Sequence, residues 1–99
     1  INLFAPTTGT TTVTFQGSTL NLSKTVTING VGSVTLSGQN ARQVVNISGG
    51  TVNLNSLTIT GGTAIIGGGV QIGPGANVTI SNSTISGNSA FSGGGIINY

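Results

Sequence analysis

Two stretches of the chain decide the expected fold, because they repeat each other without a gap. Residues 51–72 read TVNLNSLTITGGTAIIGGGVQI, and residues 77–98 read NVTISNSTISGNSAFSGGGIIN. In the alignment that sets Thr51 on Asn77, eight of the 22 aligned positions are identical. A looser copy, TVTINGVGSVTLSGQNARQVVNI, covers residues 25–47. Recurring units of this kind are typical of repeat architectures, in which each unit packs mainly against its neighbours.

Apolar and polar residues alternate within each unit, which is the pattern of half-buried strands. The alternating runs are only four or five residues long before Gly, Asn or Ser interrupts them, so short strands are expected. The alternating apolar side chains are expected to be buried; they are Val26, Ile28, Val52, Leu54, Leu57, Ile59, Val78 and Ile80.

The repeat favours stacked coils over a ladder of antiparallel hairpins. Hairpins would need two-residue turns such as Asn-Gly, and Asn29-Gly30 is the only such dipeptide. We therefore predict an all-β fold, a right-handed parallel β-helix (solenoid) of about four coils with 23–26 residues in each. Residues 1–11 are interpreted as an extended N-terminal segment, either a cap or a strand donated to a neighbour. Residues 12–99 are interpreted as the β-helix repeats.

Turn residues are expected to form columns along such a stack. Asn29 falls on Asn55 when residues 25–29 are aligned with residues 51–55, and Asn82 falls one position beyond the next equivalent place. We interpret these asparagines as a turn column in left-handed backbone, with side-chain amides bonded along the stack. The two glycine triplets coincide in the alignment of the quoted stretches and are interpreted as sites of positive φ or close backbone approach. These triplets are Gly67, Gly68 and Gly69, and Gly93, Gly94 and Gly95.

The composition excludes most catalytic and metal-binding chemistry. The chain has no Asp, Glu, His or Cys, and its only charged side chains are Lys24 and Arg42. General acid–base catalysis needs a group that titrates near neutral pH, and metal sites usually need His, Cys or carboxylates. We therefore predict no enzyme, no catalytic residue, no metal and no cofactor. Lys24, Arg42 and Tyr99 fall in different repeats and are interpreted as surface residues.

Nucleic acid and membranes are not expected partners of this segment. Two isolated cations do not make the basic stripe that is typical of nucleic-acid-binding proteins. The longest apolar runs are far shorter than a membrane-spanning helix requires. A surface of Thr, Ser, Asn and Gly is more typical of secreted and cell-surface β proteins, so we predict an extracellular or cell-surface location.

The stretch TISNSTISGNSAFSGGGI, residues 79–96, resembles a known class of repeats. It is similar to right-handed parallel β-helix repeats of bacterial surface proteins, including autotransporter passengers and polymorphic outer-membrane proteins. The resemblance covers about residues 25–99 and rests on SGNSA at 86–90 and GGGI at 93–96, with GGGV at 67–70 as a weaker copy. The Phe-x-x-Asn element of the polymorphic family is missing, because Gly94 stands three residues after Phe91. The resemblance implies an extracellular stalk or adhesin without a cofactor.

The ends of the predicted stack are expected to be uncovered, because no polar capping segment is present. Open strand edges recruit further strands, so we expect the ends to meet copies of the same chain or further coils of a longer chain. The chain is then a non-enzymatic structural or adhesive building block of a surface filament, stalk or layer. The apolar end residues are the assembly candidates: Ile1, Leu3, Phe4, Ile96, Ile97 and Tyr99.

Two other functions stay open at this point. The alternative is an ice- or glycan-binding β-helix, because threonines alternate along expected strands: Thr10, Thr12 and Thr14, then Thr25 and Thr27, and then Thr58 and Thr60. Against an ice-binding array, such pairs do not recur at one fixed place, since Val52-Asn53-Leu54 and Val70-Gln71-Ile72 interrupt them. A polysaccharide-active enzyme ranks last, although pectate-lyase-like enzymes share the architecture.

Overall fold

The described part of the chain is all β. The computed structural model describes residues 2–4, 10–14 and 19–99, which hold ten strands and no helix, hence none long and apolar enough to cross a membrane. The strands are β1 (Asn2–Phe4), β2 (Thr10–Thr14), β3 (Leu20–Leu22), β4 (Val26–Arg42), β5 (Val45–Ile47), β6 (Thr51–Gly62), β7 (Val70–Ile72), β8 (Asn77–Ser81), β9 (Thr84–Ile85) and β10 (Ile96–Asn98).

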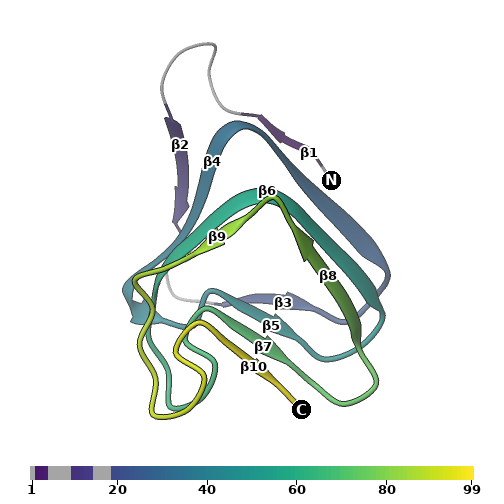
Figure 1. Cartoon of the computed structure of the whole chain (residues 1–99), viewed down its shortest axis with the longest axis vertical. Coiled ribbons are helices and arrows are strands. Elements are labelled where there is room, and N and C mark those ends of the chain that lie inside the picture. Colours follow the sequence, from purple (N-terminus) through teal and green to yellow (C-terminus); the bar gives the residue numbers. More distant parts are fainter. Residues whose placement is uncertain (1, 5–9, 15–18) are drawn as a thin grey trace.

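The strands form two sheets in which every pairing is parallel. One sheet has the order β1-β4-β6-β8, with β2 also paired to β4 and β9 also paired to β6. The other sheet has the order β10-β7-β5-β3. Figure 1 shows a closed, roughly triangular outline, in which β4 and β6 each follow two sides and the second sheet makes the third.

We call the three sides of this outline the first, second and third sides. The first side holds residues 26–29 of β4, residues 51–55 of β6, and β8. The second side holds β2, residues 34–37 of β4, residues 57–60 of β6, and β9. The third side is the sheet of β3, β5, β7 and β10.

On the first side, residues that are equivalent in the sequence repeat are paired on neighbouring strands. Val52 of β6 lies between Val26 of β4 and Val78 of β8. On the third side, Val70 lies between Val45 and Ile96. Like residues therefore stand beside like residues on neighbouring strands, which is what a parallel in-register arrangement requires.

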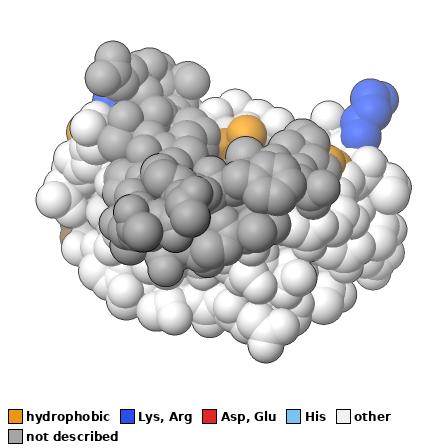
Figure 2. Space-filling model, turned by 90° about the horizontal axis from the view of Figure 1, so that it is seen from above, with side chains coloured by type: hydrophobic (Ala, Val, Ile, Leu, Met, Phe, Trp, Pro, Cys, Tyr) orange, Lys and Arg blue, Asp and Glu red, His pale blue; other side chains and the backbone are white. Residues whose placement is uncertain are grey.

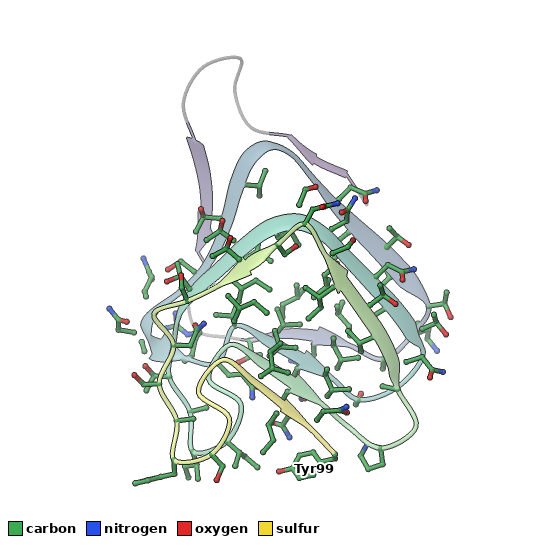
Figure 3. The ribbon with its side chains drawn as sticks, viewed as in Figure 1. Tyr99 is labelled. Atoms are coloured by element: carbon green, nitrogen blue, oxygen red, sulfur yellow. The ribbon has the colours of Figure 1, made fainter. Side chains whose placement is uncertain are left out.

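The core lies inside the triangular outline, and among the described residues its buried side chains are all apolar (Figure 3). Its buried members are Ile28, Val34, Leu36, Val44, Val45, Ile47, Val52, Leu54, Leu57, Ile59, Val70 and Ile72. Val26, Val78 and Ile80, which were expected to be buried, are only half-buried and pack against this core. Val78 and Ile80 belong to β8, the last strand of its sheet, so no further strand covers them.

Two strands are longer than the alternation predicts. β4 has 17 residues and β6 has 12, because each continues around the corner between the first and second sides. The corner of β4 takes residues 30–33, whereas that of β6 takes Ser56 alone. The register therefore changes at this corner: Ile28 pairs with Leu54, as the repeat predicts, but Val34 pairs with Leu57, which is three positions nearer in the sequence.

The N-terminal segment, which was predicted to be either a cap or a donated strand, contains β1 and the start of β2. β1 pairs in parallel with β4 of its own chain, with Leu3 opposite Gly30 and Phe4 opposite Val31. The boundary expected between residues 11 and 12 falls inside β2, which begins at Thr10. Ile1, the remaining assembly candidate of this segment, lies outside the described residues.

Candidate binding surface

The three side chains that the sequence offered as catalytic candidates, Lys24, Arg42 and Tyr99, lie apart from one another. Lys24 is exposed just before β4 begins, Arg42 is half-buried where β4 ends, and Tyr99 is exposed after β10. Figure 2 shows the two cationic side chains at opposite sides of the molecule, and Figure 3 places Tyr99 at the bottom of the third side. The structure therefore brings no pair of these groups into one site.

Side-chain amides and hydroxyls of the first side hydrogen bond to one another along the stack. Asn55 Nδ2 donates to Asn29 Oδ1 at 3.3 Å, and Ser81 Oγ and Asn82 Nδ2 donate to Asn55 Oδ1 at 3.0 and 3.4 Å. The three predicted asparagines thus belong to one ladder. The predicted backbone conformation is wrong for two of them, because Asn29 and Asn55 lie within extended strands. The left-handed residues of this corner are Ser56 (φ 59°) and Asn82 (φ 50°), which occupy equivalent places in the repeat.

The glycine triplets line an inner corner where the chain packs tightly against itself. Gly67 and Gly93 have positive φ, at 65° and 61°. Gly68 does not, but a Cβ there would lie 2.7 Å from the Gly94 carbonyl oxygen. Backbone N–H groups of Gly68 and Gly69 donate to the carbonyl oxygens of Gly93 and Gly94 at 3.2 and 3.0 Å. These glycines are used for close backbone stacking.

The second side carries an array of hydroxyl side chains that continues through successive strands. Thr35 of β4 pairs with Thr58 of β6, which pairs with Thr84 of β9. Two positions further along the chain stand Ser37 in β4, Thr60 in β6 and Ser86 just after β9. We call these six residues the hydroxyl face: Thr35, Ser37, Thr58, Thr60, Thr84 and Ser86. Thr12 and Thr14 of β2 pair by register with Thr35 and Ser37.

The hydroxyl face points away from the core. Leu36, Ile59 and Ile85 alternate with it and point inward, Leu36 and Ile59 being buried and Ile85 half-buried at the last strand. Because successive side chains of a strand point to opposite faces, the residues before and after them lie on the outer surface. The members on β4 and β6 are half-buried among their neighbours, whereas Thr84 and Ser86 are exposed.

Most hydroxyl groups of this face make no hydrogen bond to other described residues. Within the described part of the chain only Ser37 of this face has a side-chain hydrogen bond, accepted from the backbone N–H of Gln39 at 3.1 Å. The outward side chains of the other two sides bond to each other instead. Asn53 Nδ2 donates to Thr27 Oγ1 on the first side, and Asn46 Nδ2 donates to Asn21 Oδ1 on the third.

The sequence argument against a regular threonine array is therefore wrong. It compared Thr58 and Thr60 with Val52-Asn53-Leu54, which lies on the first side, and with Val70-Gln71-Ile72, which lies on the third. On the second side the pattern Thr-x-Thr or Thr-x-Ser recurs on every strand. Thr58 and Thr60 fall on Thr84 and Ser86 at the offset of the first side, but the step from β4 to β6 is shorter on the second side, so Thr35 and Ser37 do not fall on Thr58 and Thr60 at that offset.

The last strands leave apolar side chains uncovered at one end of the stack. Ile80 and Ile85 are half-buried, whereas their register partners Leu54 and Ile59 are 0% exposed. Among the assembly candidates at this end, Ile96 is 42% and Tyr99 57% exposed, and Ile97 is half-buried. The apolar column Leu22, Ile47, Ile72 ends on Asn98, so this end is apolar on the first two sides and mixed on the third.

A shallow hollow lies beside the corner that residues 63–69 and 88–95 form. It has a volume of about 250 Å³ and is lined by Thr63, Ala64, Ser89, Ala90 and Phe91. Phe91 is 93% exposed, and Ile65, whose carbonyl oxygen accepts from the Phe91 N–H at 3.0 Å, is 74% exposed. The lining holds no charged or titratable group, so the hollow offers only apolar contact and two hydroxyls.

Comparison with known proteins leaves the chain without an assigned family. No family description, no curated protein and no solved structure matches it. The resemblance to bacterial surface repeats accordingly rests on the motif residues at 86–90 and 93–96.

Proposed function

We propose that the chain is a right-handed parallel β-helix of about four coils that serves as a non-catalytic structural or adhesive element outside the cell. In this proposal its ends are continued by further coils, either those of another copy or those of a longer chain. End-to-end continuation of this kind builds a filament, stalk or layer, because a head-to-tail contact does not close on itself.

The parallel pairings support the β-helix. Each side of the outline is paired with the same side one turn later: Val52 with Val78 on the first, Thr58 with Thr84 on the second, and Leu20 with Val45 on the third. In Figure 1 the chain runs anticlockwise from β4 through β5 to β6, with later segments nearer the viewer, which supports right-handed winding. Parallel crossover connections are right-handed in nearly all proteins.

The observation that carries the proposal is the burial difference between the middle and the ends of the interior columns. Leu54 and Ile59 are 0% exposed, but Ile80 and Ile85, one turn later, are half-buried. At the other end Leu20 and Leu22 of β3 are half-buried, while their partners Val45 and Ile47 are buried. A further coil at either end would bury these side chains and pair the free strand edges, so burial of apolar surface favours continuation.

The surface supports a structural rather than a catalytic role. The outward side chains are mainly Thr, Ser and Asn, and many bond to each other along the stack. The sequence contains no Asp or Glu, and its charge comes from Lys24 and Arg42 alone. With a net charge of only +2, copies of the chain repel each other weakly, which favours end-to-end contact.

The test compares two lysine substitutions on one strand. Val78→Lys places a charge in the interior column at the open end, whereas Thr79→Lys places the same charge on the outer surface of β8. Light scattering and electron microscopy of the purified chain and of both variants report the assembly state. Far-ultraviolet circular dichroism checks that each variant keeps its strands.

End-to-end assembly predicts elongated particles whose mass rises with concentration for the parent chain and for Thr79→Lys. Val78→Lys is expected to stay small, because a buried unpaired charge opposes stacking. A parent chain that stays a soluble monomer at high concentration overturns the proposal. Equal assembly of a folded Val78→Lys variant overturns the role given to this end.

A further inference from the structure

We propose that the hydroxyl face binds ice. The inference is carried by the two rows of Thr and Ser on the second side and does not rest on end-to-end assembly. It names one binding surface, formed by Thr35, Ser37, Thr58, Thr60, Thr84 and Ser86, and one ligand, the ordered surface of an ice crystal.

The first argument is the regular spacing of the rows. Neighbouring strands of a sheet lie about 4.8 Å apart, and side chains two residues apart on one strand are about 6.7 Å apart. Thr35, Leu36 and Ser37 pair one-to-one with Thr58, Ile59 and Thr60 without a register shift, so the rows run straight across the strands. These two spacings are close to the repeat distances of oxygen atoms on faces of hexagonal ice.

The second argument is that these hydroxyls are available. Of the six residues, only Ser37 has a side-chain hydrogen bond within the described residues. By contrast, Asn29 and Asn55 on the first side bond to each other. The hydroxyl face is thus the side whose polar groups are not satisfied by neighbouring side chains, and they are left for water.

The third argument is the chemistry of threonine. Its side chain presents a methyl and a hydroxyl on one branched carbon, and branching restricts χ1, so little side-chain entropy is lost on binding. None of the six residues is charged, and an ice surface carries no net charge to attract one. A rigid, neutral, evenly spaced surface can hold ordered water in positions that match the crystal.

A crystalline polysaccharide is the less favoured ligand for this face. Sugar rings commonly stack on aromatic side chains, which combine apolar area with a polar edge. The hydroxyl face contains no aromatic residue, and the exposed Phe91 and Tyr99 belong to the corner at residues 88–95 and to the C-terminal end. Binding to a polysaccharide is therefore treated as an outcome of the test.

The experiment measures ice binding by the whole 99-residue chain. The readouts are inhibition of ice recrystallisation and partition of a fluorescently labelled chain into a slowly growing ice hemisphere. Thr58→Lys disrupts the centre of the face, because Thr58 has a row neighbour on both sides. Thr51→Lys is the matched control: it changes the same residue type on the same strand, but at an exposed position of the first side.

A conservative substitution separates chemistry from bulk. Thr58→Val keeps the branched shape and removes one hydroxyl, so we expect the concentration needed for equal inhibition to rise about fivefold, the effect of one net hydrogen bond. Thr58→Lys is expected to abolish both signals while its circular dichroism spectrum matches that of Thr51→Lys. Retention of activity by Thr51→Lys completes the expected result.

Three outcomes overturn the proposal. The parent chain fails to enter ice and fails to inhibit recrystallisation, or Thr58→Lys and Thr51→Lys lose activity equally. In the third, the chain ignores ice but binds cellulose or chitin particles in a manner that Thr58→Lys abolishes, which reassigns the face to a polysaccharide. End-to-end assembly is scored separately by light scattering, so failure of one proposal does not count against the other.

Discussion

Alanine substitutions in one interior column test whether the end of the stack is open. Leu54 and Ile80 pair with each other on neighbouring strands, and both point into the core. Leu54 is 0% exposed and has strands on both sides, β4 and β8, whereas Ile80 is half-buried and has β6 on one side only. Truncation of Leu54 therefore removes apolar contacts to strands on both sides, whereas truncation of Ile80 removes contacts to a strand on one side only.

The expected magnitudes follow from this difference. Leu54→Ala is expected to lower the free energy of unfolding by about 3 kcal/mol, the middle of the range for buried Leu in a core that relaxes only partly. Ile80→Ala is expected to lower it by about 1.5 kcal/mol, because a substantial part of its surface still faces water in the free chain. Thr79→Ala, at an exposed position on the same strand as Ile80, is the control and should change it by less than about 0.5 kcal/mol.

The assay is urea unfolding followed by far-ultraviolet circular dichroism over a range of protein concentrations. At the lowest concentration the two costs should differ by about a factor of two. As concentration rises and ends meet, burial of Ile80 should bring its cost towards that of Leu54. Equal costs in a dilute monomer would refute the reasoning, because they would mean that Ile80 is already covered.

Three further predictions concern the stacking contacts and the charge. Gly68→Ala should destabilise the fold by several kcal/mol, because the new Cβ meets the carbonyl oxygens of Ser89 and Gly94. Gly49→Ala is the control and should change the melting temperature little, because its Cβ would lie 3.6 Å from the nearest atom. Asn55→Ala removes the bonds to Asn29 and Ser81 and should cost about 1–2 kcal/mol in urea unfolding; a cost no larger than that of Thr79→Ala would contradict the ladder. Because the sequence has no His, Asp, Glu or Cys, the melting temperature should stay constant between about pH 5 and pH 7, and a transition inside that window would contradict this reasoning.

The sequence predicted the parallel all-β arrangement because parallel, in-register strands place equivalent residues at a regular spacing along the chain. When Val52 lies between Val26 and Val78, the distance along the chain between partners is the repeat length. Alternation also identified the inward positions, since Leu54 and Ile59 are both in the core. These features depend only on neighbours along one strand or on the next turn, and both are visible in the sequence.

The corners were less predictable, because their shape depends on how many residues each strand uses to pass from one side to the next. β4 uses residues 30–33 where β6 uses Ser56 alone, and neither number follows from local propensity. The left-handed conformation accordingly falls on Ser56 and not on Asn55, although Asn tolerates it better. The same difference between the two corners moves Thr35 and Ser37 of β4 out of the offset that aligns the first side, whereas Thr58 and Thr60 still fall on Thr84 and Ser86 at that offset.

Strand propensity alone does not account for the contrast between the first and second sides. Thr favours any exposed strand position, so propensity would give both surfaces a similar mixture. On the first side the outward residues include Asn29, Asn53 and Asn55, whose amides bond along the stack. On the second side the outward positions of residues 34–37 and 57–60 and of the segment 84–86 are all Thr or Ser. The second side therefore presents a uniform array of hydroxyls to solvent, which the proposed binding of ordered water requires.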